Sequence, residues 1–485
     1  MPRPIQPGVI PIQNFNLSGL AFSKWSGLKD SFFKLIGFDM HSSPGILNVE
    51  QKLTKDSGTT VTEFCKARVN SSSGIRYWFS FTSGKIWQDK AGTYTLVYTT
   101  SPAAGTAGCL GATEYQGYIY WATQSRLHRV AVASADGATA WTANAAPNWA
   151  TFSITDASFH PMLNHTSQQI LYIGDGNYLA QVDAGVFTAN ALDISTPLRI
   201  KSLGKIGTDI LLGTYVADNI TQTEIIRWNG WGVSFTNSDP IPEVGINAFL
   251  PADNMVLVQA GKAGNIYYYD GTNLELYMKI PGTYSSTAYG EVYPDSVANK
   301  EGQILFGLSN GSGNPADQLV YRLARHNRNF SYIMDQPYPI SERSGSDFVL
   351  TGLEIGGIMV SGQIVYVAWK SATETGTVDK LDVSNKLDGA YFETRVMIVN
   401  REEQTNFSEA LIAYASLPAS TAINFYLDKN YAGYGDALSK IDDTQRYIVR
   451  TKDEATEFNT LQLRVKVTTS SNSAPQIESG AVITR

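Results

Sequence analysis

The chain has 485 residues, of which 43% are hydrophobic and 17% are charged, and its 37 basic and 44 acidic residues give a formal net charge of −7. This length is sufficient for two or three domains with large cores, and the acidic balance argues against a surface that grips phosphate backbones. The 42 Gly, 26 Tyr, 20 Phe and 9 Trp, with Ser, Thr and Asn between short apolar runs, indicate an all-β protein.

The first 56 residues contain Pro, Gly and Ser and lack the pattern of the region that follows, so we expect an extended N-terminal segment over residues 1–56. The best helical candidate in the chain is the short stretch Lys29–Ile36. Met1 to Phe15 has no apolar stretch of signal-peptide length, and no run approaches the roughly 18 apolar residues of a membrane span. We therefore expect synthesis in a cytoplasm and no membrane span.

A turn rich in Asp, Asn and Gly recurs along the chain, each time between two β-like runs. It is found at Asp89, Asp136-Gly137, Asp183–Gly185, Asn229-Gly230 and Asp270-Gly271, at steps of 47, 47, 46 and 41 residues. A nearly constant period of this size is typical of stacked or radial repeats. We interpret each turn as the hairpin between the outer strands of one repeat, because Asn-Gly and Asp-Gly supply positive φ angles.

Each turn is preceded by three apolar runs of strand length, of which the last two form a pair. A further run follows several of the turns. The paired runs are Ile75–Phe81 with Lys85–Trp87, Gly117–Trp121 with Leu127–Val132, Gln169–Ile173 with Tyr178–Val182, Asp209–Leu212 with Glu224–Trp228, and Asn254–Gln259 with Asn265–Tyr269. The runs after the turns are Tyr94–Tyr98, Val233–Phe235 and Leu274–Tyr277. Four antiparallel strands in about 45 residues make the blade of a β-propeller.

Two weaker copies continue the series, and the insertion Ser309–Asp317 lengthens the first of them as a surface loop. Their runs are Gln303–Leu308 and Gln318–Leu323 with a turn near Asn327, then Gln363–Trp369 and Val378–Leu381 with a turn near Asp388-Gly389. We therefore predict a propeller of seven four-stranded blades over residues 57–394, with six blades as the alternative.

The last region, residues 395–485, has no repeat turn and alternates strand-like runs with loops. The runs are Thr394–Val399, Glu409–Ala415, Ala422–Tyr426, Gln445–Arg450, Thr460–Thr468 and Gln476–Ile483. Six runs with a period of two residues predict a separate C-terminal β-sandwich.

No motif in the sequence indicates catalysis, a cofactor or a metal, so we predict no catalytic, cofactor-binding or metal-binding residue. The two cysteines, Cys65 and Cys109, are interpreted as separate buried thiols. The five histidines, at positions 41, 128, 160, 165 and 326, have no nucleophile motif nearby and are interpreted as loop or partly buried polar residues.

Three weaker signals have structural interpretations that we prefer. Ser134–Trp141 approaches the Asp box of sialidase-like propellers but departs from it at Ala138 and Ala140, and that box is a folding element. The acidic groups Asp428–Asp436, Asp442-Asp443 and Glu402-Glu403 suit solvated loops better than a calcium site. The aromatic residues Trp228, Trp231 and Tyr267–Tyr269 suit wedges between blades better than a sugar-binding face.

Ser43-Pro44-Gly45-Ile46, followed by the strand pair Ile75–Phe81 and Gly84-Lys85-Ile86-Trp87, resembles the opening of tailed-bacteriophage tail proteins. Among these, the propeller-bearing tail nozzle (hub) proteins of short-tailed phages are the most similar. The ending, Tyr391-Phe392-Glu393-Thr394 and then a sandwich with Leu461–Val467 near its end, is similar to the closing strands of that family.

The resemblance implies a structural virion protein without enzymatic activity, made in the host cytoplasm and located in the tail. Such a protein forms a ring of copies of itself below the portal and adaptor, contacts tail fibre proteins, and extends the DNA channel. Packaged DNA passes through the lumen without sequence-specific binding and is retained until ejection. We expect residues 1–56 and 309–317 to make intersubunit or channel contacts.

Two other function classes remain open at this stage. A propeller with a sandwich rich in Tyr, Trp and Asn also fits a tail fibre or tail-tip adhesin that binds host-surface glycans through propeller loops. A glycan hydrolase is the third choice. The absence of heptads and of short shaft-like repeats from the sequence favours the nozzle over the adhesin.

Overall fold

The computed structural model describes residues 8–12, 19–21, 23, 25, 31–43, 45–58, 60–100, 108–137, 140–141, 146–216, 223–253, 255–282, 284, 289–310, 319–325, 331–342, 350, 352–398, 405–415, 417–437, 440–441 and 454–484. Nearly all regular structure in them is β-strand, which confirms the all-β prediction. No helix in this part of the chain is long and apolar enough to cross a membrane. Contacts divide the chain into a propeller unit, residues 55–318 and 349–380, and a sandwich unit, residues 1–54, 319–348 and 381–485.

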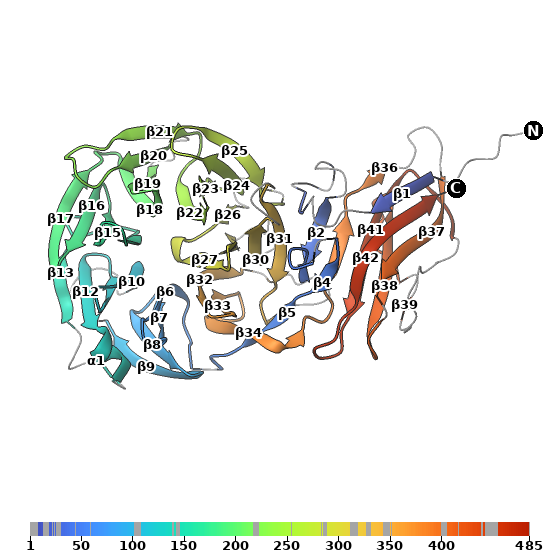
Figure 1. The fold of residues 1–485 in the computed structure, drawn as a ribbon, viewed down its shortest axis with the longest axis horizontal. Coiled ribbons are helices and arrows are strands. Elements are labelled where there is room, and N and C mark those ends of the chain that lie inside the picture. Colours follow the sequence, from blue (N-terminus) through green and yellow to red (C-terminus); the bar gives the residue numbers. More distant parts are fainter. Residues whose placement is uncertain are drawn as a thin grey trace, which may run out of the picture. The chain divides into compact units, whose positions relative to one another are not determined.

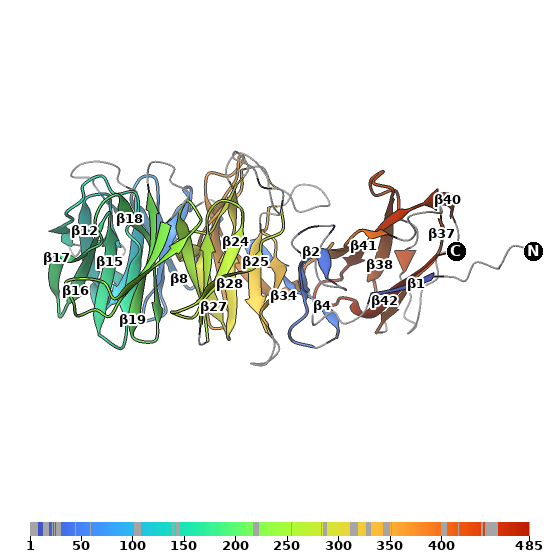
Figure 2. The ribbon, with the colours of Figure 1, turned by 90° about the horizontal axis from the view of Figure 1, so that it is seen from above.

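The propeller unit contains five consecutive four-stranded antiparallel sheets, arranged around a ring (Figure 1). Seen from the side, their strands run between the two faces of the ring (Figure 2). The strands are β6 (Cys65–Asn70), β7 (Arg76–Ser80), β8 (Lys85–Lys90) and β9 (Thr93–Thr99); β10 (Gly111–Tyr115), β11 (Tyr118–Ala122), β12 (Arg126–Ala131) and β13 (Ala146–Thr151); β14 (Met162–His165), β15 (Ile170–Asp175), β16 (Tyr178–Asp183) and β17 (Val186–Asp193); β18 (Leu198–Ile206), β19 (Asp209–Val216), β20 (Thr223–Trp228) and β21 (Asn237–Ile241); and β22 (Ile246–Ala252), β23 (Met255–Ala260), β24 (Asn265–Tyr269) and β25 (Leu274–Lys279).

The chain after these sheets supplies two more sets of four strands. One set is the antiparallel pair β27 (Val297–Lys300) and β28 (Gln303–Gly307) with the antiparallel pair β30 (Val320–Ala324) and β31 (Ile333–Tyr338). The other is the sheet β32-β33-β34-β5, formed by Glu354–Ser361, Ile364–Lys370, Thr377–Lys386 and Gln51–Lys55. The predicted propeller of seven four-strand sets is thereby confirmed. Residues 311–317 and the turn near Asn327 lie outside the described residues.

The last blade differs from the prediction in the origin of its outer strand. Strand β34 continues across the unit division, and its outer partner is the N-terminal strand β5. After Asp388-Gly389 the chain enters β35 (Tyr391–Thr394), which pairs with a strand of the sandwich instead. An outer strand taken from the N-terminal side covers the edge of β34 and joins the two ends of the repeat in one sheet.

The recurring turns match the prediction in part. Ala184 and Gly185 have φ angles of 47° and 80°, as a tight hairpin between β16 and β17 requires. Asp136-Gly137, by contrast, ends a short helix, α1 (Val132–Gly137). The predicted strand Val233–Phe235 is wrong, because the loop folds back so that Trp228 Nε1 donates to Gly232 O at 2.9 Å, and β21 begins only afterwards.

The sandwich unit consists of two sheets that enclose one core. One sheet has the order β3-β4-β42-β37-β40 with β1 beside β42, and the other contains β31-β2-β35-β41-β38-β39 with β36 beside β41. Phe32, Phe392, Val465 and Ile477 are among its fully buried residues. The strands not yet named are β1 (Gly8–Ile12), β2 (Phe32–Ile36), β3 (Phe38–Asp39), β4 (Leu47–Val49), β36 (Met397–Ile398), β37 (Thr405–Tyr414), β38 (Ala422–Lys429), β39 (Lys440–Ile441), β40 (Glu454–Phe458), β41 (Thr460–Thr468) and β42 (Gln476–Thr484).

The N-terminal segment is therefore part of the sandwich and not a separate extended region. β4 pairs with β42, and β2 pairs with β35. The helical candidate Lys29–Ile36 is a strand over its described part, because its apolar residues hydrogen-bond across to β35 and face the core. The boundaries between the two units fall at 54/55 and 380/381, compared with the expected 56/57 and 394/395. The predicted strand Gln445–Arg450 lies outside the described residues.

Candidate functional site

A short segment between β25 and β27 leaves the blades and lies inside the ring of the propeller unit (Figure 1). Its strand β26 (Gly290–Glu291) pairs with β29 (Ser309–Asn310), and Gly290 N donates to Lys262 O at 3.0 Å. The following 3-10 turn, Pro294–Ser296, contacts the first strands of three blades, β6, β22 and β32. The segment thus brings polar side chains against inner strands of different blades.

Lys66 is the centre of the resulting group of side chains. Lys66 lies on β6 where the pairing with β7 shifts by one residue between Cys65 and Ala67, and its side chain is partly buried. Its ammonium lies 3.8 Å from the ring centroid of Phe81 and 3.9 Å from that of Tyr293, which are cation–π distances. No described carboxylate lies within ion-pair distance of this ammonium.

Two lysine–glutamate pairs flank Lys66. Lys201 on β18 forms an ion pair with Glu291, and its Nζ also donates to Asn247 Oδ1 at 2.7 Å. Lys370 and Glu354, directly opposite each other on β33 and β32, form an ion pair at 2.8 Å. Tyr293 Oη donates to Glu354 Oε2 at 3.0 Å. We call Lys66, Phe81, Tyr293 and these two pairs the Lys66 cluster.

The Lys66 cluster has more positive than negative charge. Three lysines face two glutamates, and both glutamates already have a lysine partner. Burial lowers the pKa of Lys66 to about 8; Glu291 and Glu354 counteract this, whereas Lys370 and Lys201 add to it. Burial would raise the pKa of Glu291, but the charge and hydrogen bond of Lys201, together with the charges of Lys66 and Lys262, outweigh it, so the pKa is below its ordinary value. The arrangement can attract an anion.

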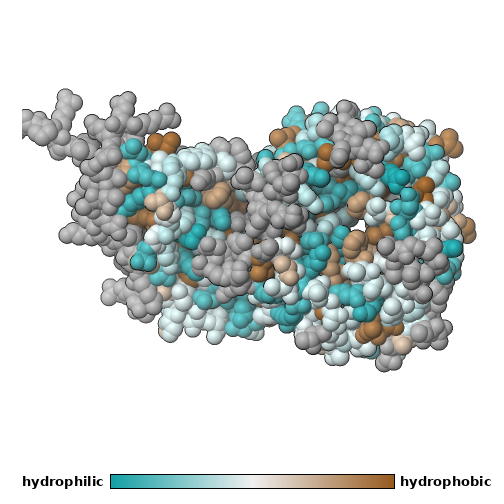
Figure 3. Space-filling view, turned by 180° about the vertical axis from the view of Figure 1, so that it is seen from behind, coloured by the Kyte–Doolittle hydropathy of each residue, from teal (hydrophilic) through white to brown (hydrophobic). Residues whose placement is uncertain are grey.

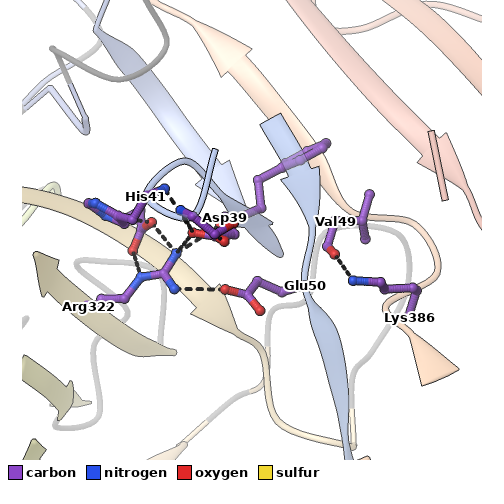
Figure 4. Close-up of polar contacts among 9 residues, drawn as sticks. Asp39, His41, Val49, Glu50, Arg322 and Lys386 are labelled. Atoms are coloured by element: carbon purple, nitrogen blue, oxygen red, sulfur yellow. Dashed lines mark hydrogen bonds and ion pairs between the residues drawn. The ribbon is translucent and has the colours of Figure 1, made fainter. Parts of the chain in front are cut away.

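A second polar group lies in the sandwich unit, around the buried Arg322 (Figure 4). Its guanidinium donates twice to Asp335, at 3.0 and 2.6 Å, once to Glu50 at 2.7 Å and once to Asp39 at 3.1 Å. His41 Nε2 lies 3.3 Å from Asp335 Oδ2. Because Arg322 is only 2% exposed, every one of its partners is needed to offset the cost of burying the charge.

The Arg322 network joins parts of the sandwich unit that are far apart in sequence. Asp39 and Glu50 flank β4, whereas Arg322 and Asp335 lie opposite each other on β30 and β31. Burial would raise the pKa of Asp39, but the charge of Arg322 and the hydrogen bonds from Ser42 and His41 together outweigh it and lower that pKa. Beside this network, Lys386 Nζ donates to Val49 O at 2.8 Å. We interpret the group as a structural anchor for β30 and β31.

The structure places the cysteines and histidines considered from the sequence at separate positions, and not together in one site. Cys65 and Cys109 are buried free thiols, as predicted, and burial raises the pKa of both. His160 is buried, with its ring nitrogens 2.7 and 3.1 Å from the carbonyl oxygens of Gly174 and Gln124. His128 and His165 are also buried, and burial lowers the pKa of His128 to about 4. His326 lies outside the described residues.

The acidic and aromatic residues considered from the sequence also lie at separate positions. Asp428 Oδ1 accepts the Gly433 amide at 2.9 Å, as a loop-stabilising carboxylate does. Trp228 and Tyr269 are buried wedges, as predicted, whereas Trp231 is 80% exposed and is not a wedge. Among the described residues, no group of three potential metal ligands occurs. Asp442, Asp443, Glu402 and Glu403 lie outside the described residues.

The Lys66 cluster was missed by sequence reasoning. Its members come from strands of different blades and from the segment inside the ring, so no spacing in the sequence connects them. One local signal was available: two basic residues, Lys66 and Arg68, interrupt an otherwise apolar first strand, where a charge needs a partner.

No family model and no curated protein matches this chain. Among solved structures, the extracellular domain of the hybrid two-component system BT4673 from B. thetaiotaomicron is 13% identical, with a TM-score of 0.48 over 74% of this chain and 43% of that chain. A catalytically inactive virginiamycin B lyase from Staphylococcus aureus is 12% identical, with a TM-score of 0.46 over 68% of this chain and 99% of that one. The WD40 β-propeller domain of Doa1 is 12% identical, with a TM-score of 0.43 over 69% and 96%. These similarities concern the fold alone.

Proposed function

We propose that this chain is a structural protein of a bacteriophage tail, a nozzle- or hub-like subunit of the virion. In this role it forms a ring with other copies of itself, contacts the portal or adaptor and the tail fibre proteins, and extends the channel that retains packaged DNA until ejection. The order of sequence elements supports the proposal. The structural observation that carries it furthest is the path of the chain between its two units.

The chain passes between the sandwich unit and the propeller unit four times, at 54/55, 318/319, 348/349 and 380/381. Most domain pairs are joined by a single exposed linker. Four covalent connections divide a mechanical load that one linker would carry alone. The Arg322 network adds to this, because it fixes β30 to Asp39 and Glu50 within the sandwich unit. Resistance to load suits a subunit that holds pressurised DNA.

The position of β26 also bears on where DNA would pass. Strand β26, whose Glu291 forms an ion pair with Lys201, lies inside the ring of blades (Figure 1). The turn Pro294–Ser296 contacts the first strands of three blades. We therefore expect the channel of the proposed assembly to be enclosed by several copies and not to run along the axis of one propeller. The net charge of −7 suits a wall that DNA slides past.

Cryo-electron microscopy of the parent particle tests the proposal. A ring of this chain coaxial with the portal is the expected result, and density restricted to peripheral appendages would overturn it. Light scattering of the purified chain gives a second measurement, in which assembly into closed rings is expected at high protein concentration.

One observation favours the alternative of a tail-tip adhesin that binds host-surface glycans. The loop between β20 and β21 exposes Trp231 by 80% and Val233 by 96%, and exposed aromatic residues on propeller loops suit sugar rings. The face in Figure 3 shows hydrophobic residues as separate spots on the propeller unit. Binding of the chain to host cells that is lost in Trp231→Ser would support the adhesin, and unchanged binding would count against this loop.

A further inference from the structure

We propose that the Lys66 cluster is a binding site for a small ligand with a single carboxylate. The Lys66 ammonium, which contacts the rings of Phe81 and Tyr293, holds that carboxylate. This goes beyond the structural role proposed above and is independent of it. The site lies within the propeller unit, where the segment inside the ring meets β6, β32 and β33.

The first argument is that no carboxylate among the described residues forms an ion pair with Lys66, whose ammonium contacts only aromatic rings. A partly buried ammonium is costly unless an anion or hydrogen-bond acceptors offset its loss of water. Aromatic faces offset part of this cost, but rings give less than a carboxylate would. Glu291 and Glu354 are engaged by Lys201 and Lys370, so neither is available as the partner of Lys66. A ligand anion would complete the site.

The second argument concerns the charge of that anion. The cluster has three ammonium groups and two carboxylates, and Lys262, whose charge also acts on Glu291, is exposed to water, so one negative charge brings the cluster itself to neutrality. A dianion such as hydrogen phosphate would leave an excess of negative charge beside Glu291 and Glu354. A carboxylate has the required single charge and the oxygen acceptors that a lysine ammonium binds.

The third argument concerns the remainder of the ligand. Glu354 and Glu291 are partly exposed, at 25% and 21% of their side chains, and their oxygens accept hydrogen bonds. Phe81 is 37% exposed and offers an apolar face beside Lys66. A carboxylate ligand that also has hydroxyl groups and an apolar ring face, such as a sugar acid, uses all three features. A simple carboxylate would contact the Lys66 ammonium alone.

Calorimetric titration of the full chain tests the proposal with four probes: D-glucuronate, acetate, inorganic phosphate and D-glucose. Saturable binding of glucuronate, with no binding of glucose, is the expected result. Tighter binding of glucuronate than of acetate assigns the site to sugar acids, and equal binding assigns it to carboxylates in general. Tighter binding of phosphate than of either carboxylate, or no carboxylate binding at all, overturns the proposal.

The variant Lys66→Met removes the ammonium and keeps a flexible side chain against the two rings. We expect glucuronate to bind it about 10- to 100-fold more weakly, as the loss of a hydrogen bond to a charged group implies. Lys90→Met, at the exposed end of β8, is the matched control and should bind as the original chain does. Equal binding by the two variants would contradict the proposal.

A measurement on the unaltered chain avoids any dependence on folding of the variant. Acylation of lysine amines at pH 8, followed by mass spectrometry of peptides, reports the accessibility of each ammonium group. Glucuronate should slow acylation of Lys66 and leave that of Lys90 unchanged. The affinity should also fall as the pH rises above 8, because Lys66 then loses the proton that holds the carboxylate. An affinity independent of pH from 7 to 9.5 would place the ligand elsewhere.

Discussion

Arg322 and Asp335 are joined by two hydrogen bonds, Nε to Oδ1 at 3.0 Å and Nη2 to Oδ2 at 2.6 Å, and neither side chain is more than 3% exposed. They are cross-strand neighbours on β30 and β31, and Nη1 of the same guanidinium extends to Glu50. A guanidinium shared in this way orients its donors so that three carboxylates can be buried together.

Substitution of Arg322 tests the importance of this network. Arg322→Met would leave Asp39, Glu50 and Asp335 buried without their cation, so we expect a loss of about 3–5 kcal/mol in the free energy of unfolding. Denaturant unfolding measures the change. Arg199→Met is the control, because Arg199 is 35% exposed and lies 4.0 Å from Asp156, and its effect should stay within about 0.5 kcal/mol. Similar losses for both variants would contradict the role of the network.

The lowered pKa of Lys66 predicts how stability depends on pH. In the folded chain Lys66 titrates at about 8, against 10.5 for an unperturbed lysine, so between these values the unfolded state binds more protons. Stability should therefore rise from pH 8 to pH 10.5, by an amount on the order of 2–3 kcal/mol. The difference between the original chain and Lys66→Met in chemical denaturation isolates this contribution. A difference that stays constant over that range would show that Lys66 is not destabilised by burial.

Asp175 gives a prediction of the opposite sign. Burial raises its pKa to about 6; its Oδ2 accepts the amides of Ser153 and Ile154 at 2.7 and 3.2 Å, and Oδ1 has no hydrogen-bond partner in the described part of the chain. Since the folded state binds more protons between pH 3.8 and 6, stability is lost as the pH rises through 6.

Asp175→Asn should therefore be more stable than the original chain at pH 7.5, by about 1–3 kcal/mol, and the gain should shrink towards pH 4. The neutral amide retains an oxygen acceptor for the two backbone donors and removes the buried charge. Thermal unfolding at several pH values measures this. Asp156→Asn, on an exposed side chain, is the control and should show no such trend.

Tyr77 offers a test of the contact between the first blade and α1. Its Oη donates to Asp136 Oδ1 at 2.6 Å and accepts a hydrogen bond from Gln88 Nε2 at 3.0 Å, while its ring packs against Trp141. Tyr77→Phe keeps the ring and should cost about 1–3 kcal/mol in the free energy of unfolding, because Gln88 then loses an acceptor in a buried site. Tyr118→Phe, at a 36% exposed position, should be nearly neutral.

The parts of the fold that depend on neighbours in sequence could be predicted. The turn at Ala184-Gly185 and the strand Thr460–Thr468 agree with the structure, because positive φ angles and alternation of apolar residues are local properties. Val233–Phe235 could not be predicted from its apolar character, since Trp228 holds the loop away from the blade.

The sequence by itself determined the repeat, the all-β class and the burial of the two cysteines. Only the tertiary structure decided that β5 completes the last blade, that β4 pairs with β42, and that Lys66 meets Tyr293. The physical reason is that an open strand edge and a buried ammonium are stabilised by whichever partner the fold brings within reach, at any separation in sequence. A repeat period specifies the blades, but it contains no information about contacts among their inner strands.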